Sequence, residues 1–261
     1  MKQFFVLIIF CFPLYLLAQN NEETGYSDTI RVHDPEHYNI EHLKIYSVTG
    51  KIARSGDLLN GKKEGIWREY YENGFLSRVL LYHEDVLNGI TLMFQTSGML
   101  MREADFSRGK LNGILHEYTD NYLSLEENYI NGVLNGWRRV YKNSVIAEEG
   151  GWKMGKRDSI NRWYYEDGKE SVEYNYTNGM IEGASKSFFE SGQLKAEGTF
   201  RNNYEEGLWK EYLESGKENS EGLYKAGKKN GKWKIFNEDG RLQKMIEYLD
   251  GKVVKETAVK K

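Results

Sequence analysis

Cysteine and proline are almost absent from this chain of 261 residues. Cys11 is the only cysteine and lies in the apolar stretch at the N-terminus, so the rest of the chain has no thiol for a disulfide, a metal site or a nucleophile. The two prolines, Pro13 and Pro35, both precede residue 44. Because proline interrupts β-ladders, its absence beyond that point permits an unbroken sheet.

Long apolar runs are confined to the N-terminus, where residues 1–18 are predicted to be a signal peptide. Lys2 supplies the positive end, Phe4 to Leu17 is apolar, and Ala18 is a small residue at a plausible cleavage point. Phe10 stands before Cys11 where lipidation requires a small residue. We therefore expect export to the periplasm, the cell surface or the medium.

The charge balance argues against two classes of partner. Loss of Lys2 with the signal peptide changes the net charge from 36 − 39 = −3 to 35 − 39 = −4. A mildly acidic protein has no general attraction to nucleic acid or to anionic lipid, so neither a nucleic-acid partner nor a membrane-surface partner is expected.

Glycine and aromatic residues recur every 23–24 positions from about residue 61 onward. The anchor glycines are Gly65, Gly89, Gly113, Gly136, Gly183, Gly207 and Gly231, and the longer gap of 47 residues contains one degenerate unit assigned to Ile160. An aromatic follows each anchor by five residues, at Tyr70, Phe94, Tyr118, Tyr141, Tyr165, Phe188, Tyr212 and Phe236. Such a fixed period indicates one small structural unit stacked many times.

Each unit reads as a β-hairpin. A tight turn such as Glu72-Asn73-Gly74 separates two short runs rich in aromatic and β-branched residues. A second turn column joins the units, at Gly61, Asp85, Gly109, Gly132, Gly155, Gly179, Asn203, Gly227 and Gly251. Asp and Asn are the residues that best replace glycine at positive φ, so this column predicts left-handed backbone at every junction.

Alternation in the second strand of each unit predicts that one face is buried. Leu76, Leu80 and Tyr82 share one parity, and the other parity is more polar. In the first strand neither parity is uniformly apolar, which points to a hidden bulge or strong twist. The anchor glycines are interpreted as hollows that receive a ring from a neighbouring strand.

Units such as Glu64 to Gly74 and Glu206 to Gly216 resemble the variant MORN repeat, a family found in bacterial exported proteins and in antitoxin components. The resemblance implies an all-β fold, an elongated, twisted array of antiparallel hairpins forming a single-layer or coiled, solenoid-like sheet, and it supplies no catalytic residues. The expected organisation is a signal peptide at 1–18, a polar leader at 19–43, MORN-like repeats at 44–251 and a basic tail at 252–261, which is able to add an end strand.

The polar leader contains the densest cluster of potential ligands. It comprises His33, Asp34, Glu36, His37, Glu41 and His42. A pair of histidines four residues apart suits a metal on a helix, but Pro35 argues against a helix and favours a solvated linker. His83 and His116 are expected to be exposed polar residues. We expect no cofactor, no metal and no enzymatic activity, because no nucleophile or phosphate-binding motif is present.

The aromatic columns provide the remaining candidate sites. Trp67, Trp209 and Trp233 are possible partner-binding aromatics, although packing inside the array is the favoured interpretation. The sequence therefore predicts a non-enzymatic exported scaffold that contacts other proteins. Two alternatives stay open: a module that binds cell-wall glycan through exposed aromatics, and an inhibitor of the antitoxin or immunity type that acts outside the cytoplasm.

Overall fold

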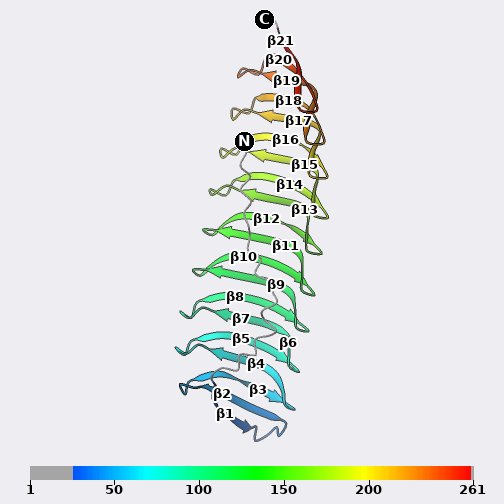
Figure 1. Ribbon diagram of the computed structural model, residues 1–261. Coiled ribbons are helices and arrows are strands. Elements are labelled where there is room, and N and C mark those ends of the chain that lie inside the picture. The colour runs from blue at the N-terminus through cyan, green and yellow to red at the C-terminus, as the bar shows by residue number, and fades with distance from the viewer. Residues whose placement is uncertain (1–25, 260–261) are drawn as a thin grey trace.

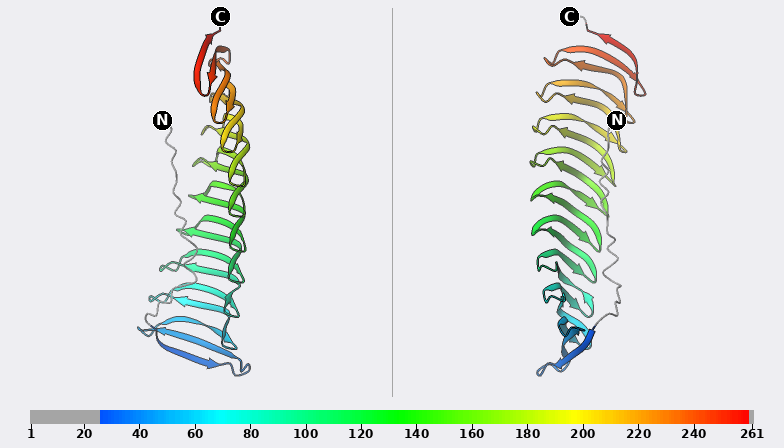
Figure 2. Two further views of the ribbon diagram at one scale, coloured as in Figure 1. Left: turned by 45° about the vertical axis from the view of Figure 1, so that its right-hand side comes forward. Right: turned by 60° about the vertical axis from the view of Figure 1, so that its left-hand side comes forward.

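A computed structural model describes residues 26–259, and every regular element in that range is a β-strand. The strands form one open antiparallel sheet in which neighbours along the chain are neighbours in space (Figure 1). The sheet is a long, twisted ladder with its first and last strands at opposite ends (Figure 2). The predicted fold class, an elongated all-β array of hairpins, is confirmed.

The first half of the ladder contains ten strands. They are β1 (Tyr26–His33), β2 (Ile40–Ser47), β3 (Ile52–Leu59), β4 (Lys62–Tyr70), β5 (Leu76–His83), β6 (Val86–Leu87), β7 (Gly89–Phe94), β8 (Leu100–Ser107), β9 (Lys110–Thr119) and β10 (Tyr122–Ile130). The short β6 and β7 together occupy one rung, since both pair with β5.

The second half continues the same pattern. Its strands are β11 (Val133–Lys142), β12 (Val145–Lys153), β13 (Lys156–Tyr164), β14 (Glu170–Thr177), β15 (Met180–Phe188), β16 (Leu194–Arg201), β17 (Tyr204–Tyr212), β18 (Glu218–Lys225), β19 (Lys228–Phe236), β20 (Leu242–Leu249) and β21 (Lys252–Ala258). Within residues 26–259, no helix has the length and apolar character that crossing a membrane requires.

The junction turns have the predicted left-handed backbone. All nine positions of this column have positive φ, including the two that are not glycine, Asp85 at 69° and Asn203 at 68°. The amide of the junction residue also bonds the preceding unit: Gly227 donates to the carbonyl of Glu205 at 3.0 Å and Gly251 to that of Lys229 at 2.9 Å. These bonds fix the stacking of each unit on the previous one.

The anchor glycines lie in a bulge. Thr199 pairs with Glu206 and Glu197 pairs with Lys210, so the register advances two residues on β16 and four on β17. Gly207 lies in this bulge with φ of 76°, and the other six anchors also have positive φ. The suspected irregularity in the first strand is therefore a repeated bulge, which explains why simple alternation fails there.

Two predictions about the anchor glycines are wrong. No ring contacts an anchor glycine in the way expected: around Gly65 and Gly231 nothing lies within 4 Å of an added Cβ. Glycine is required at these positions because side chains rarely tolerate positive φ. In addition, the degenerate anchor is Ser159, which has a φ of 61°, and not Ile160. The aromatic that follows this anchor by five residues is therefore Tyr164 and not Tyr165.

The sheet begins before the predicted start of the repeats. Residues 26–33 form β1 and residues 40–47 form β2, so most of the expected polar leader belongs to the ladder. Apolar Ile30 and Val32 alternate with polar Thr29, Arg31 and His33, which suits a strand, but this stretch lacks the glycine signature used to detect units. The basic tail forms the end strand β21. The predicted signal peptide and the stretch from Asn20 to Glu23 lie outside the described residues.

Candidate functional site

One face of the sheet carries an aromatic residue on every repeat. The register places an aromatic opposite each anchor: Tyr82, Phe106, Tyr129, Trp152, Tyr176, Phe200, Tyr224 and Tyr248. Because side chains alternate across a strand, these rings all project from the same side. We call this side the aromatic face.

Rings on the C-terminal half of the aromatic face touch one another in an unbroken series. The series runs edge to face through Trp163, Tyr174, Phe200, Trp209, Tyr224, Trp233 and Tyr248, with centroid separations from 5.2 to 6.3 Å. Such T-shaped pairs stabilise by about 0.5–1.5 kcal/mol beyond the burial of their area. The series joins β13 to β20 in one apolar surface.

Residue sizes are matched across the centre of the aromatic face. In several units the residue two positions after the anchor and the residue that it faces on the preceding strand are one large and one small; Arg138, which faces Glu127, is an exception. Tryptophan faces glycine three times, as Trp67 on Gly56, Trp209 on Gly198 and Trp233 on Gly222, whereas Leu115 faces Ala104 and Ser185 faces Tyr174. These glycines, which have ordinary φ, are the ones that accept a ring.

The three tryptophans singled out from the sequence are anchored alike but exposed differently. Their indole N–H groups donate to backbone carbonyls of Asp57, Thr199 and Leu223, at 3.0, 3.1 and 3.0 Å. Trp67 is 3% exposed and Trp233 is 0% exposed, so both are packed inside the array. Trp209 is partly exposed, and only this ring of the three is within reach of a partner.

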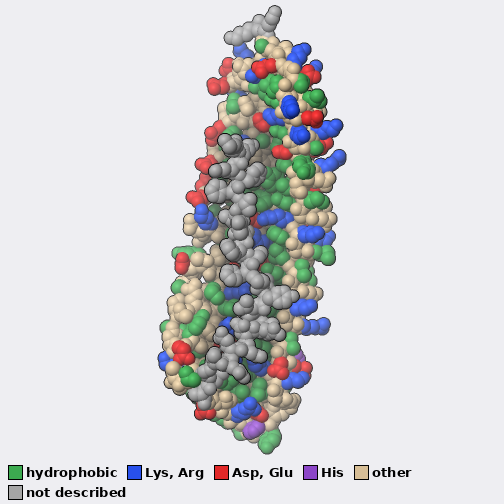
Figure 3. Space-filling view, viewed as in Figure 1, with side chains coloured by type: hydrophobic (Ala, Val, Ile, Leu, Met, Phe, Trp, Pro, Cys, Tyr) green, Lys and Arg blue, Asp and Glu red, His purple; other side chains and the backbone are tan. Residues whose placement is uncertain are grey.

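A groove opens beside Trp209. It has a volume of about 690 Å³ and spans β14 to β18 on the aromatic face. Trp209, Tyr224 and Phe200 form its wall, Phe189 and Leu213 reach it from the hairpin turns, and charged and polar side chains complete the lining. Figure 3 shows hydrophobic side chains along the middle of the sheet, with Lys and Arg along one margin.

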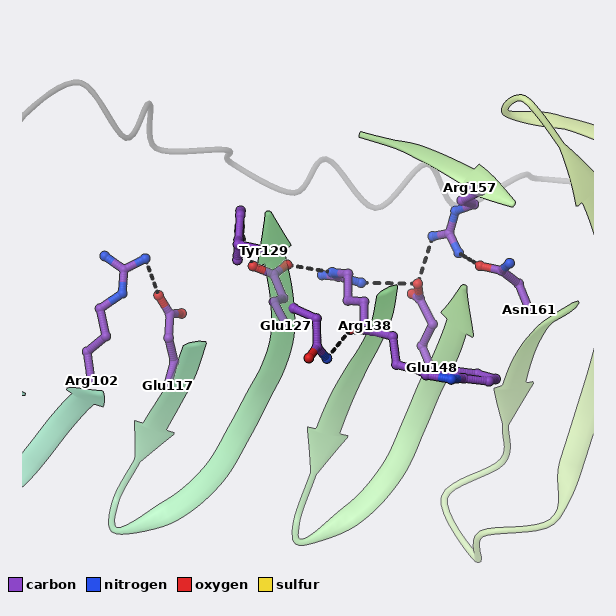
Figure 4. A network of polar contacts seen from close by, with 10 residues as sticks. Arg102, Glu117, Glu127, Tyr129, Arg138, Glu148, Arg157 and Asn161 are labelled. Carbon is purple, nitrogen blue, oxygen red and sulfur yellow. Dashed lines mark hydrogen bonds and ion pairs between the residues drawn. The ribbon is translucent and has the colours of Figure 1, made fainter. Parts of the chain in front are cut away.

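The middle of the aromatic face also contains a chain of ion pairs (Figure 4). Arg138 donates to Glu127 at 2.9 Å and to Glu148 at 3.1 Å, and Arg157 donates to Glu148 at 2.7 Å and to Asn161 at 2.8 Å. The side chains of Glu127, Arg138 and Glu148 are 11–14% exposed. Two positive and two negative groups balance one another, so the network is neutral.

Cations also lie over rings of the aromatic face, a feature that the sequence analysis missed. The Lys63 ammonium lies 4.8 Å from the ring centroids of both Trp67 and Tyr82, and the Lys229 ammonium lies 3.6 Å from that of Trp233. Both lysines stand two residues before an anchor glycine. That fixed offset was the available signal, but the bulge that folds the lysine back over the ring is not visible in the sequence.

A family model for the MORN repeat variant matches four stretches, residues 63–84, 181–202, 205–226 and 229–250. The chain contains variant MORN repeats. Each match starts two residues before an anchor glycine. MORN repeats are in general interaction repeats that contact proteins or lipids. A comparison with curated proteins found no match.

The histidine-rich segment of this MORN-repeat protein forms an ordered turn at the N-terminal end of the ladder. Asp34 accepts the backbone N–H groups of Glu36 and His37, which lowers the pKa of the Asp34 carboxyl to about 2. His42 bonds Asp57 at 2.7 Å, and this bond raises the pKa of its imidazole. Among residues 26–259, no group of three or more His, Cys, Asp or Glu side chains is placed to hold a metal ion.

The other two histidines lie in strands beside carboxylates. His83 bonds Glu64 at 3.0 Å, which raises the pKa of the imidazole, and His116 lies between Glu103 and Glu126 at 3.7 and 3.4 Å. These pairs join neighbouring strands of the ladder. Their geometry suits cross-strand pairing of surface side chains.

Proposed function

We propose that this MORN-repeat protein is a non-enzymatic scaffold that binds partner proteins along its aromatic face. The observation that carries the proposal is the unbroken series of rings from Trp163 to Tyr248, which leaves a groove open at Trp209. Trp and Tyr are enriched among the few residues that dominate binding energy in protein interfaces, and an extended surface suits an extended partner.

The shape of the groove favours binding over catalysis. It lies along the surface of a single-layer sheet and receives residues from five strands and two turns. The ionisable residues around it are carboxylates, a lysine and tyrosines. Burial, followed by the nearby carboxylates, raises the pKa of Tyr212 and of Tyr224 to about 12. Such tyrosines stay protonated at neutral pH and serve as hydrogen-bond donors.

We propose that the protein acts outside the cytoplasm. The apolar N-terminal stretch and the acidic balance expected after its removal suit a protein that works outside the cytoplasm, in the periplasm or at the cell surface. Partners in that compartment are envelope or secreted proteins. The absence of cysteine after residue 11 suits an array that relies on packing and hydrogen bonds under oxidising conditions.

The opposite face offers a second apolar column that the test must separate from the first. It consists of the residues directly after the anchors and includes Ile66, Ile90, Ile114, Trp137 and Leu208, which are 43–53% exposed. Across the strands, Leu208 pairs with the exposed Leu223, whereas Ile90 pairs with Asp105, so apolar and polar neighbours both occur along this column. A photo-cross-linking residue placed on each face distinguishes them.

The experiment replaces Phe189, at the rim of the groove, or Leu208, on the opposite face, with a photo-cross-linking amino acid in the mature protein. After irradiation in its own envelope extract, we expect protein adducts from position 189 and few from position 208. Adducts confined to position 208, or adducts to polysaccharide alone from position 189, would overturn the proposal. The second of these results would support the glycan-binding alternative, and an adduct with a secreted toxin would support the inhibitor alternative.

A further inference from the structure

Cations of the chain itself cover the rings of the aromatic face in three units. The residue two positions before the anchor is Lys63 in one unit, Arg157 in another and Lys229 in a third. Arg157 lies 5.1 Å from the centroid of Trp152 and 4.9 Å from that of Trp163. A cation within about 6 Å of an aromatic centroid is attracted by the electron density of the ring face.

These cations cover the tryptophan rings and shield them from solvent. Trp67 under Lys63 and Trp233 under Lys229 are 3% and 0% exposed. Burial lowers the pKa of the Lys63 ammonium, with repulsion from Arg54 as the next cause. The rings and the ammonium groups thus shield one another from water.

The unit of Trp209 breaks this pattern. Its residue two positions before the anchor is Glu205, a carboxylate, where the units of Trp67 and Trp233 have lysine. Among the described residues, no cation lies over Trp209 or Tyr224, the ring pair equivalent to Trp67 and Tyr82. Trp209 is correspondingly partly exposed and lines the groove.

The groove has the electrostatic character that a cation needs. Three carboxylates line it, Glu205, Glu211 and Glu214, against one ammonium, Lys195. Lys195 lies toward the turn, 5.5 Å from the ring of Phe189. From β19, Lys229 lies 3.8 Å from Glu211, but its ammonium covers Trp233 rather than Trp209.

We propose that Trp209, Tyr224 and Glu205 form a site for a lysine or arginine side chain of a partner polypeptide. The partner's cation takes the place that Lys63 and Lys229 fill in their own units. The two rings attract it through their faces, Glu205 provides an ion pair, and the neighbouring Phe200 and Leu213 contact its aliphatic stem. This inference rests on the proposed function, since it names the group that a partner protein inserts into the groove.

The six tryptophans provide the readout. Isotope labelling of tryptophan gives one indole N–H resonance for each in a two-dimensional NMR spectrum, and a Trp209→Phe variant assigns the one of interest. Hexalysine and hexaglutamate are the probes. We expect hexalysine to shift the Trp209 resonance in a saturable manner, with the covered Trp67 and Trp233 unaffected, and hexaglutamate to have no effect.

Glu205→Lys is the decisive variant because it supplies from the chain the cation that the site lacks. We expect its affinity for hexalysine to fall at least about tenfold. Glu205→Gln, which keeps the size and removes the charge, should weaken binding about threefold. Glu238→Lys, which makes the same change of charge at an exposed turn outside the groove, should bind hexalysine within about twofold of the wild type.

Several results would overturn the inference. Equal shifts at all indoles, equal weakening by Glu205→Lys and Glu238→Lys, or undiminished shifts in Glu205→Lys would show general attraction to charge rather than a site. A dispersed backbone spectrum for each variant confirms that the fold is retained. A protein partner that cross-links at position 189 and is insensitive to Glu205→Lys would leave the scaffold standing and remove the cation site alone.

Discussion

The indole of Trp233 lies directly on the backbone of Gly222, in the neighbouring strand β18, and an added Cβ at Gly222 would come closer than 3.0 Å to the ring. The same pairing of tryptophan and glycine recurs at Trp67 and Trp209. In these three units the glycine of one hairpin receives the indole of the next, and this pair couples the two hairpins.

Gly222→Ala tests this coupling. The new methyl group must displace a fully buried indole, so we expect a loss of about 1–3 kcal/mol in the free energy of unfolding, measured by denaturant titration. Adding Trp233→Leu reproduces the natural pairing of Leu115 with Ala104. The double variant should lose less free energy of unfolding than the two single variants lose together. Strict additivity of the losses would show that the two residues are not coupled.

The anchor glycines are required for their positive φ and not for lack of space, so substitutions there distinguish backbone strain from steric crowding. At Gly207, φ is 76° and the nearest atom to an added Cβ is the Thr199 hydroxyl at 3.4 Å. Gly207→Val should cost about 2 kcal/mol or more through backbone strain, because a β-branched side chain is poorly tolerated at positive φ. Gly207→Asn should cost less than half as much in the same denaturant titration. Equal losses in both variants would point to crowding instead.

The ion-pair network in the middle of the array has a shared carboxylate. Glu148 accepts hydrogen bonds from both Arg138 and Arg157, and its side chain is 14% exposed. Glu148→Leu removes the carboxylate that both guanidinium groups bond, and we expect the free energy of unfolding to fall by about 3 kcal/mol. Removing the exposed Lys142–Glu166 pair by Glu166→Gln provides the control, and we expect no measurable change in the free energy of unfolding there. A similar lack of change for Glu148→Leu would contradict the network's role.

The N-terminal end of the ladder should respond to pH through His42. Its hydrogen bond to Asp57, and then that to Asp34, raises the pKa of the imidazole above its usual 6.5. The protonated histidine therefore stabilises this end fully below pH 6.5, and the contribution disappears as the pH rises through the raised value. We expect amides of β1 to exchange faster with solvent above that value. Asp57→Asn should lower the His42 pKa in an NMR titration, and an unchanged pKa would contradict the assignment.

Asp34 has the opposite dependence at low pH. Backbone hydrogen bonds from Glu36 and His37 lower its pKa to about 2, so its contribution is complete above the ordinary value near 3.8 and disappears as the pH falls toward 2. Amide exchange of residues 36 and 37 reports this transition. The two groups leave the turn at residues 34–39 best supported at mildly acidic pH.

The turn columns could be read from the sequence because one physical requirement governs them. Gly61, Asp85 and Asn203 all have positive φ, and the residue types at these regularly spaced positions indicate that requirement. The second-strand parity of Leu80 and Tyr82 was equally readable, since no bulge interrupts the pairing of those residues with β4. The fold followed from these two regularities.

The candidate functional site was harder to predict from the sequence, because of the bulge. The bulge at each anchor advances the register by two additional residues, so positions before and after it meet in a way that counting by twos does not reveal. Ser159 was overlooked because its neighbour Ile160 fits the period almost as well. The lysines over Trp67 and Trp233, and Glu205 beside Trp209, acquire meaning only when that geometry is known.

The covering of the tryptophans is the central claim, and paramagnetic relaxation by a neutral gadolinium chelate measures it directly. In the wild type the ring protons of Trp209 should relax several times faster than those of Trp67 and Trp233. In Glu205→Lys the Trp209 rate should fall toward theirs. Equal rates for all three rings in the wild type, or a Trp209 rate unaffected by the substitution, would contradict the account.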